Sequence, residues 1–298
     1  LHMSPEHETS LAEVLQASAR IPVTTVVDRE RVQPNHVYVV SPRQSLSMSD
    51  GYLVQSPISR VEERRAPVDI FFRTLAESQA ARAVCAVLSG TGADGSMGLK
   101  RVKELGGVCI VQDADEAEYG DMPRNALATD LADAVLPVAE MPSWIAAYRD
   151  VKGAVRLPEE PQGRHEPDER ALHDVFAQLR LRTGHDFSNY KRATVLRRVE
   201  RRLGVPQLPV LRSYAAYVHE HPEEARGLLK DLLISVTQFF RDHQAFERLE
   251  RVVIPRLFER KRGDDQVGVW VPGCATGEEA YSIAMLLAEH ASVTPGSP

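Results

Sequence analysis

Apolar and polar positions follow two patterns in the first half of the chain. Short apolar runs predict strands, and apolar residues spaced three and four apart predict helices. Strands are expected at 36–40, 83–88, 108–111 and 134–138, helices at 68–80, 96–105 and 143–148, and a hairpin turn at 49–51. Strands that alternate with helices are typical of a parallel sheet covered by helices on both faces.

A helical pattern replaces this alternation from residue 168. Leu172, Val175 and Leu179 lie on one face of an amphipathic helix. Further apolar faces predict helices near 195–203, 228–233 and 246–253, and Pro255 is expected to start or kink the next turn. Residues 150–167 contain Pro, Gly and charged residues without an apolar period, which predicts a linker between the two parts.

The pattern changes once more at 267–290. Val267–Val271 predicts a buried strand, the small residues from Gly273 to Gly277 predict a tight turn, and a helix is expected from Glu278 onward. A strand, a glycine-containing turn and a helix form the usual opening of an open α/β sheet, whose crevice binds cofactors. Because such a sheet needs several more strands, we expect this chain to hold only the start of that domain.

Composition and charge narrow the class of protein. A length of 298 residues, 43% hydrophobic and 26% charged, is typical of a globular protein with about two domains. No apolar run approaches the ~20 residues of a membrane span, so no membrane insertion is expected. The odd, widely spaced cysteines Cys85, Cys109 and Cys274 indicate free thiols in a reducing cytoplasm.

The charge is unevenly distributed along the chain. Residues 1–148 hold 13 Lys and Arg against 20 Asp and Glu, a net charge of −7. Residues 168–262 hold 19 Lys and Arg against 13 Asp and Glu, a net charge of +6. The basic middle part therefore predicts an acidic partner for that segment.

Asp94 is the first candidate for chemistry. It lies in the glycine-rich loop SGTGADGSMG, directly after the strand predicted at 83–88. Ligands and catalytic groups gather at the carboxyl ends of strands in open α/β sheets. From spacing alone, an aspartate that caps the following helix is the favoured alternative.

A cluster of cations forms the second candidate. Arg197 and Arg201, and likewise Arg198 and Arg202, are spaced four apart and therefore share one side of a helix. A solvated helix face is the usual explanation of such a run. Nucleic-acid binding is disfavoured because no aromatic residues interleave with the arginines and the whole chain is acidic.

Residues 2–149 resemble the catalytic domain of the chemotaxis receptor methylesterases (CheB type). The matching segments are HMSPEHETSLAEVL, PNHVYVV, PVDIFFRTLA, VLSGTGADGSMGLKRVKELGG, and VQD followed by MPRNAL. The resemblance implies hydrolysis of a glutamyl methyl ester by a serine, histidine and aspartate triad. It places the histidine at His2 and the aspartate at Asp94, which would hold the imidazole in the correct tautomer. The family serine precedes His2 and is expected outside this chain, and Thr91 replaces the usual Met.

Three later segments resemble the chemotaxis receptor methyltransferases (CheR type). They are DFSNYKRATVLRRVERRL, DLLISVTQFFRDHQAFERL and VWVPGCATGEEAYSIAMLL, in that order. The resemblance implies that S-adenosylmethionine is the cofactor. Glycine allows close backbone approach, a carboxylate can pair with the cationic end of the cofactor, and arginine suits its carboxylate. The implied cofactor-binding residues are Ser235 (Asn in many relatives), Thr237, Arg241, Gly273, Gly277 and Glu279.

The alternative for the two acidic residues at 278–279 is stabilisation of the first turn of a helix. The resemblance also implies a partner for the four arginines, the acidic, glutamate-rich helical bundle of chemoreceptors. Arg197, Arg198, Arg201 and Arg202 would then bind the substrate.

Together these resemblances predict part of a fused sensory regulator that adds and removes methyl groups on receptor glutamates. The expected fold class is α/β plus all-α. The expected domains are an incomplete methylesterase-like domain at 1–149, a linker at 150–167, a helical methyltransferase domain at 168–262 and the incomplete cofactor domain at 263–298. The alternative is an inactive fragment that serves as a receptor-binding or scaffold module.

Overall fold

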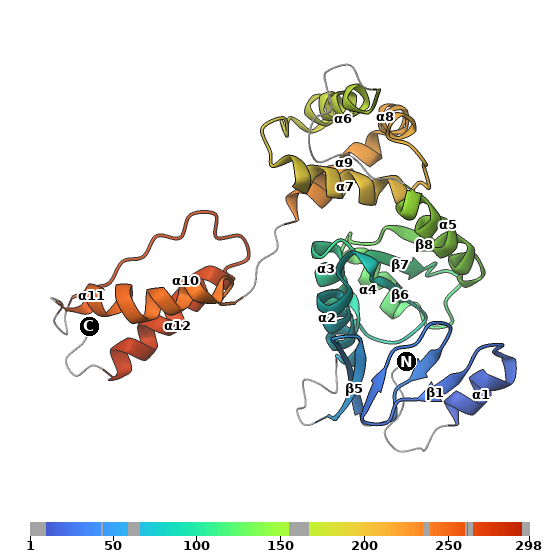
Figure 1. Ribbon diagram of the computed structural model, residues 1–298, viewed down its shortest axis with the longest axis horizontal. Coiled ribbons are helices and arrows are strands. Elements are labelled where there is room, and N and C mark those ends of the chain that lie inside the picture. The colour runs from blue at the N-terminus through green and yellow to red at the C-terminus, as the bar shows by residue number, and fades with distance from the viewer. Residues whose placement is uncertain are drawn as a thin grey trace. The chain divides into compact units, whose positions relative to one another are not determined.

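The computed structural model describes most of the chain and divides into two compact units (Figure 1). The units are Leu1–Ile234 and Ser235–Pro298. The described residues are 10–42, 44–58, 66–154, 167–234, 239–259, 261 and 265–293. His2, Ser235 and Thr237 therefore lie outside the described residues.

The first unit begins with small β-structures. Helix α1 (Leu11–Ser18) precedes β1 (Val23–Thr25), which pairs in parallel with β3 (Val37–Val39). An antiparallel sheet has the order β2-β5-β4, with bounds Arg29–Arg31, Tyr52–Pro57 and Gln44–Ser49. The predicted hairpin turn is confirmed, because Ser49 pairs with Tyr52 across Asp50 and Gly51, both at positive φ.

A three-stranded parallel sheet forms the centre of the α/β part. Its order is β6-β7-β8, with bounds Val84–Val87, Val108–Gln112 and Ala134–Leu136. The helices are α2 (Pro67–Gln79), α3 (Ser96–Glu104), α4 (Asp121–Ala128) and α5 (Met141–Ala154), with short 3-10 turns at Ala80–Arg82 and Val138–Glu140.

Side chains along the strands of this sheet pack alternately into two separate hydrophobic cores. Cys85 and Val111 pack with residues of α2, α3 and α4, whereas Val108 and Ile110 pack with residues of α5. This is the alternation that a strand with both faces covered requires. The predicted parallel sheet with helices on both faces is confirmed.

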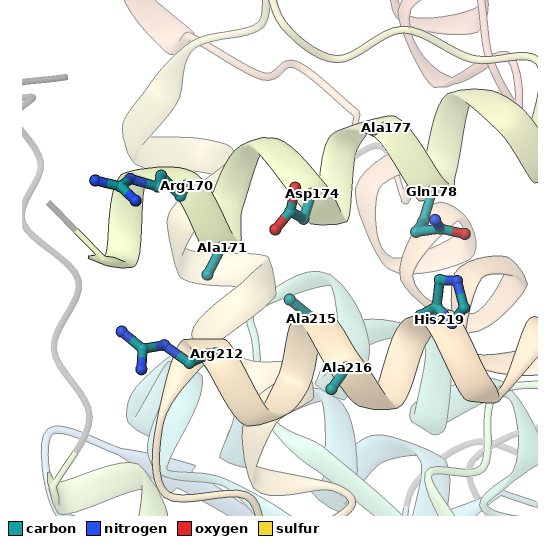
Figure 2. Close-up of a pocket in the computed structure, with 9 residues that line it drawn as sticks. All are labelled: Arg170, Ala171, Asp174, Ala177, Gln178, Arg212, Ala215, Ala216 and His219. Atoms are coloured by element: carbon teal, nitrogen blue, oxygen red, sulfur yellow. The ribbon is translucent and has the colours of Figure 1, made fainter. Parts of the chain in front are cut away.

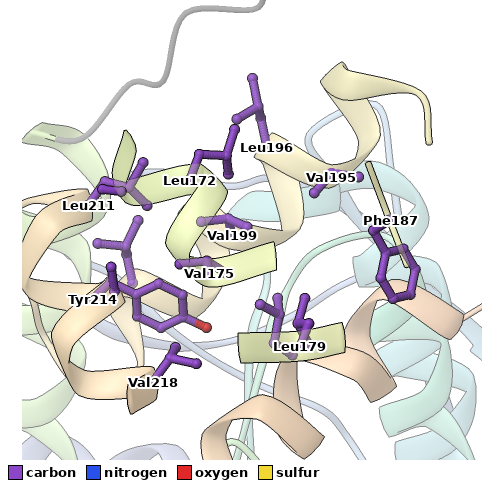
Figure 3. Close-up of a cluster of buried hydrophobic side chains, with 14 of the residues drawn as sticks. Leu172, Val175, Leu179, Phe187, Val195, Leu196, Val199, Leu211, Tyr214 and Val218 are labelled. Atoms are coloured by element: carbon purple, nitrogen blue, oxygen red, sulfur yellow. The ribbon is translucent and has the colours of Figure 1, made fainter. Parts of the chain in front are cut away.

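The rest of the first unit is helical. It contains α6 (Pro167–Thr183), α7 (Arg192–Gly204), α8 (Leu211–Glu220) and α9 (Pro222–Leu233). The predicted apolar face of α6 is buried, and Leu172, Val175 and Leu179 enter a core with side chains of α7 and α8 (Figure 3). Helix α8 is an addition to the predicted helices, although Tyr214 and Val218 on its inner face are completely buried.

The second unit is a separate small body. It contains α10 (His243–Arg248), a π-helical turn (Leu249–Val253), α11 (Ile254–Phe258) and α12 (Glu278–Val293). The π-helical turn lies directly before Pro255, which has no N–H and therefore cannot donate the α-helical hydrogen bond to the carbonyl four residues earlier. Ile254 and Phe258 pack against Leu286 of α12 and form the core of this unit.

Two expectations differ from the structure here. Val267–Val271 is not a strand, and Trp270 within it is 87% exposed. A parallel strand needs hydrogen-bonding neighbours, and no described residue pairs with this segment. The unit boundary lies at Ile234, whereas the sequence pattern placed a boundary at 262. The helix predicted at 246–253 corresponds to α10 and the π-helical turn, which pack with α12 inside the second unit.

Candidate functional site

Asp94 lies between β6 and α3 and binds the start of α2. Its two carboxylate oxygens accept the backbone N–H groups of Val68 and Asp69, each at 3.0 Å. These are N–H groups of the first turn of α2, which have no partner within the helix. Asp94 therefore does cap a helix, but the helix is α2, which precedes it in the chain, and not the following α3. A carboxylate has further lone pairs, so this role leaves sites for a second donor.

A reciprocal contact joins α2 to α3. Asp69 of α2 accepts the backbone N–H of Gly98 in the first turn of α3 at 2.6 Å. Burial raises the pKa of Asp69, and the nearby Asp94 carboxylate adds to this effect. A Cβ atom on Gly98 would lie only 2.7 Å from Cβ of Phe72, so the close approach of the two helices requires glycine.

Hydrogen bonds also join the glycine-rich loop to the end of β7 and to the segment that follows it. The backbone N–H of Gly90 donates to the Tyr119 carbonyl at 2.9 Å, and the Asn125 side chain donates to the Gly92 carbonyl at 2.8 Å. The Ser89 N–H donates to Gln112 Oε1 at 2.7 Å. The structure thus brings together the loop and the segments VQD and MPRNAL. Gln112 and Asn125 were not singled out from the sequence, because only the fold places them beside the loop.

The candidate cofactor site lies before α12 in the second unit. Gly273, Ala275 and Gly277 all adopt positive φ, and the Gly277 N–H donates to the Cys274 carbonyl at 3.0 Å to close the turn. A Cβ atom on Gly273 would meet nothing within 4 Å, so the turn is open on that side. Glu279 is exposed in the first turn of α12.

The segment that contains Arg241 is attached to this same helix. The Phe240 N–H donates to Ser282 Oγ at 2.9 Å, and the Ser282 hydroxyl donates to the Glu278 carbonyl at 2.6 Å. Residues 279 and 282 are three apart and therefore neighbours on the helix surface. The structure thus connects the Arg241 segment and the helix that bears Glu279, two motifs that are separate in the sequence.

The residues present fit S-adenosylmethionine. The open glycine turn allows close backbone approach, and the exposed Glu279 carboxylate suits a cationic amino or sulfonium group. Arg241 offers donors that match a carboxylate. Ser235 and Thr237 remain predictions, because they lie outside the described residues.

The arginines of α7 do not form the exposed stripe that the sequence predicted. Arg197 is exposed, but Arg198, Arg201 and Arg202 are only 4%, 3% and 8% exposed. Arg198 donates to the carbonyls of Lys103 and Glu104 at 3.0 and 3.1 Å, at the end of α3. In this arrangement, three of the four predicted substrate-binding arginines therefore face the protein interior. A local charge pattern misses this, because the acidic partners come from distant segments.

We call the six charged residues at this location the charge cluster: Lys103, Asp133, Arg201, Arg202, Glu224 and Asp231. Arg201 pairs with Asp133 and Asp231, Arg202 pairs with Glu224, and Lys103 lies 2.6 Å from Asp133 and 3.2 Å from Asp231. Three cations balance three carboxylates in the interior. Two members belong to the α/β part and four to the helical part, so the cluster joins the two parts of the first unit.

The charge cluster sets the ionisation of Asp133. Burial by itself would raise the pKa of Asp133, but the charges of Arg201 and Lys103 lower it to about 2. For Arg201, burial by itself would lower the pKa, and the carboxylates of Asp133 and Asp231 raise it instead. The ionised form of each partner therefore stabilises the other.

The lowered pKa of Asp133 predicts a loss of stability in acid. A folded-state pKa below the ordinary value means that its stabilisation is complete above about pH 4 and is lost as the pH falls toward 2, by about 2 kcal/mol. Urea unfolding between pH 5 and pH 2.5 measures it. Asp133→Asn should lack this component of the acid dependence, whereas Asp150→Asn, at an exposed position, should keep it. Equal acid dependence of the wild type and Asp133→Asn would contradict the expectation.

A groove of about 600 Å³ lies between α6 and α8 (Figure 2). Alanines from both helices line it, with Arg170 and Arg212 at one end and Gln178 and His219 at the other. No sequence motif indicated it, because its lining combines faces of two helices whose packing only the fold decides. Its lining includes none of the predicted catalytic or cofactor residues.

Comparisons with known families cover both units. Residues 1–145 match the family model for CheB methylesterase. Residues 170–233 match the all-alpha domain of CheR methyltransferase, and residues 235–296 match its SAM binding domain. The last boundary coincides with the division between the two structural units.

Individual proteins and one solved structure are also similar to parts of this chain. An uncharacterised 104.1 kDa protein of Rhodobacter capsulatus is 36% identical over 93% of this chain and 31% of its own length. A protein-glutamate methylesterase/protein-glutamine glutaminase of Hydrogenovibrio crunogenus is 32% identical over 49% of this chain and 40% of its own length. The crystal structure of the Thermotoga maritima CheB methylesterase catalytic domain shares 28% identity, covers 48% of this chain and 77% of that structure, and has a TM-score of 0.43.

These matches define a chain in which a methylesterase region precedes a methyltransferase region. The CheB methylesterase domain lies at residues 1–145 and is followed by the all-alpha domain (170–233) and the SAM binding domain (235–296) of CheR methyltransferase. The chain spans 31% and 40% of the length of the two relatives named above. Among the described residues, no helix has the length and apolar character that crossing a membrane demands.

Proposed function

We propose that the second half of the chain belongs to a methyltransferase that transfers a methyl group from S-adenosylmethionine to receptor glutamates. The observation that carries this proposal is the attachment of the Arg241 segment to α12 through Phe240 and Ser282, within a region that matches the CheR SAM binding domain. When bound, the cofactor supplies an activated methyl group on a sulfonium. Arg241 would hold its carboxylate, Glu279 its cationic end, and the turn at Gly273 and Gly277 would approach it closely.

We propose that the first half belongs to the opposing methylesterase. Relatives that match it are named protein-glutamate methylesterase/protein-glutamine glutaminase. His2 would remove the proton from a serine nucleophile, and Asp94 would orient the imidazole. Asp94 is held in place by two backbone N–H groups of α2, which supports a rigid orienting role. Such a pair of activities would set the methylation level of a chemoreceptor.

The proposed partner is an acidic helical bundle of a chemoreceptor. Of the predicted docking arginines, Arg197 faces solvent and is retained in this role. The proposed compartment is the cytoplasm. Cys85, Cys109 and Cys274 are free thiols, which a reducing compartment maintains.

Methyl transfer by the complete gene product tests the first activity. The protein is incubated with S-adenosylmethionine labelled at the methyl group and with a glutamate-rich helical receptor peptide. We expect label that is released as methanol in base, which identifies a carboxyl ester. A peptide with alanine at the glutamates should stay unlabelled.

Release of methanol from a methylated peptide at neutral pH tests the second activity. Asp94→Asn should slow this release without slowing methyl transfer, because the two sites lie in different units. Peptide binding without labelling or release would favour the scaffold alternative and refute both proposed activities. No observation in the described residues favours that alternative.

A further inference from the structure

Ser282 is completely buried at the centre of the contact between the Arg241 segment and α12. Its hydroxyl donates to the Glu278 carbonyl one helical turn earlier, at 2.6 Å, and accepts the Phe240 N–H at 2.9 Å. A serine hydroxyl has one proton to donate and lone pairs to accept, so both bonds form at the same time. Phe240 in turn packs edge-on against Phe246, with ring centroids 5.5 Å apart.

The residues on both sides of Arg241 adopt an unfavourable backbone conformation. Phe240 has φ 51° and Asp242 has φ 61°, in the left-handed region that non-glycine residues rarely occupy. Such a conformation persists only where surrounding contacts hold it. After Arg241, the Asp242 carbonyl accepts the N–H groups of Ala245 and Phe246 at the start of α10. Before Arg241, the described side-chain hydrogen bond that holds the backbone is the one to Ser282.

We propose that Ser282 is a positioning residue that fixes Arg241 for recognition of the cofactor carboxylate. Ser282 does not touch the cofactor in this proposal; it acts through the backbone of Phe240. The inference rests on the proposed function, because it assigns Ser282 a role in binding S-adenosylmethionine. Without the Ser282 hydroxyl, the strained backbone before Arg241 would relax, and the guanidinium would no longer be held for contact with the cofactor carboxylate.

The chain offers a matched control on the same helix. Ser292 also donates its hydroxyl to a carbonyl of α12, that of Glu289 at 2.7 Å, but it is exposed, and no backbone N–H of the described residues donates to it. Ser282→Ala removes the acceptor for the Phe240 N–H. Ser282→Cys nearly keeps the side-chain volume but weakens this hydrogen bond, because a thiol is a weak acceptor. Agreement between the two variants separates the lost hydrogen bond from a packing defect.

Two measurements on this chain test the proposal. Hydrogen exchange of the Phe240 amide reports the contact without any cofactor, and calorimetry reports the affinity for S-adenosylmethionine. We expect Ser282→Ala and Ser282→Cys to lose protection at Phe240 and to bind the cofactor about tenfold more weakly. Ser292→Ala should match the wild type in both measurements.

A double-mutant cycle separates positioning from general destabilisation. In an Arg241→Ala background, Ser282→Cys should weaken binding by less than about twofold, because the residue that it positions is absent. Equal losses with and without Arg241, or unchanged Phe240 protection in the Ser282 variants, would overturn the proposal. Failure of the wild type to bind the cofactor while Phe240 stays protected would refute the proposed function, and with it the cofactor role of Ser282.

Discussion

Replacing Arg201 with alanine is expected to lower the free energy of unfolding of the first unit by about 3–5 kcal/mol. The guanidinium lies 3% exposed between Asp133 and Asp231, and its Nε donates to the Gly107 carbonyl at 2.9 Å. Removing it leaves two carboxylates in the interior with too few cations. Desolvation of an unpaired charge costs more than the loss of one exposed ion pair.

Fluorescence of Trp144 can follow this unfolding. Trp144 stacks on Tyr148, and a Cβ atom on Gly204 of α7 would lie 2.5 Å from the Tyr148 ring, so the pair lies where α5 contacts α7. A Trp270→Phe background removes the second tryptophan, which lies in the other unit. Urea unfolding should shift to a lower midpoint in Arg201→Ala.

Arg197→Ala provides the control, since Arg197 is exposed on the same helix. Its effect should stay within about 0.5 kcal/mol, as is usual for surface substitutions. A midpoint for Arg201→Ala equal to that of Arg197→Ala would show that the charge cluster does not stabilise the fold. It would also restore Arg201 as a candidate for contact with an acidic partner.

Replacing Arg241 with alanine is expected to weaken binding of S-adenosylmethionine by about 100-fold. The proposed contact is a bidentate pair of charge-assisted hydrogen bonds between the guanidinium and the cofactor carboxylate. Arg241→Lys keeps the charge but loses the planar pair of donors, so it should restore only part of the affinity. Calorimetry with the purified chain measures all three proteins.

Arg251→Ala is the matched control, an exposed arginine of the same unit outside the candidate site. Its affinity for the cofactor should equal that of the wild type. Equal losses in Arg251→Ala and Arg241→Ala would point to a general effect of net charge. Unchanged affinity in Arg241→Ala would remove Arg241 from the cofactor site.

Periodicity predicted the elements that depend on local pattern. The two cores on either face of β7 follow from alternation within the strand, and the buried face of α6 follows from spacing three and four apart. The hairpin at Asp50–Gly51 follows from residues that tolerate positive φ. The motifs of both families could also be read from the sequence, because each motif is a contiguous run of residues and needs no knowledge of the fold.

Burial of charge and pairing of strands could not be predicted in this way. Arg197 and Arg201 share one side of α7, yet one is exposed and the other lies in the charge cluster. The difference arises from Asp133 and Asp231, which are 68 and 30 residues away from Arg201 in the chain. Likewise, 267–271 has the composition of a strand, but a strand forms only beside a hydrogen-bonding neighbour.

The sequence by itself determined the helices and strands with a clear apolar period, although not α8 or the conformation of 267–271, and which residues belong to the methylesterase and methyltransferase motifs. Only the tertiary structure decided that Asp94 caps α2, that three arginines are neutralised inside the first unit, and that Ser282 holds the backbone before Arg241. The physical reason is the separation along the chain of the residues that determine each property. Local pattern encodes backbone preference and face, whereas hydrogen bonds and ion pairs depend on which distant groups packing brings within reach.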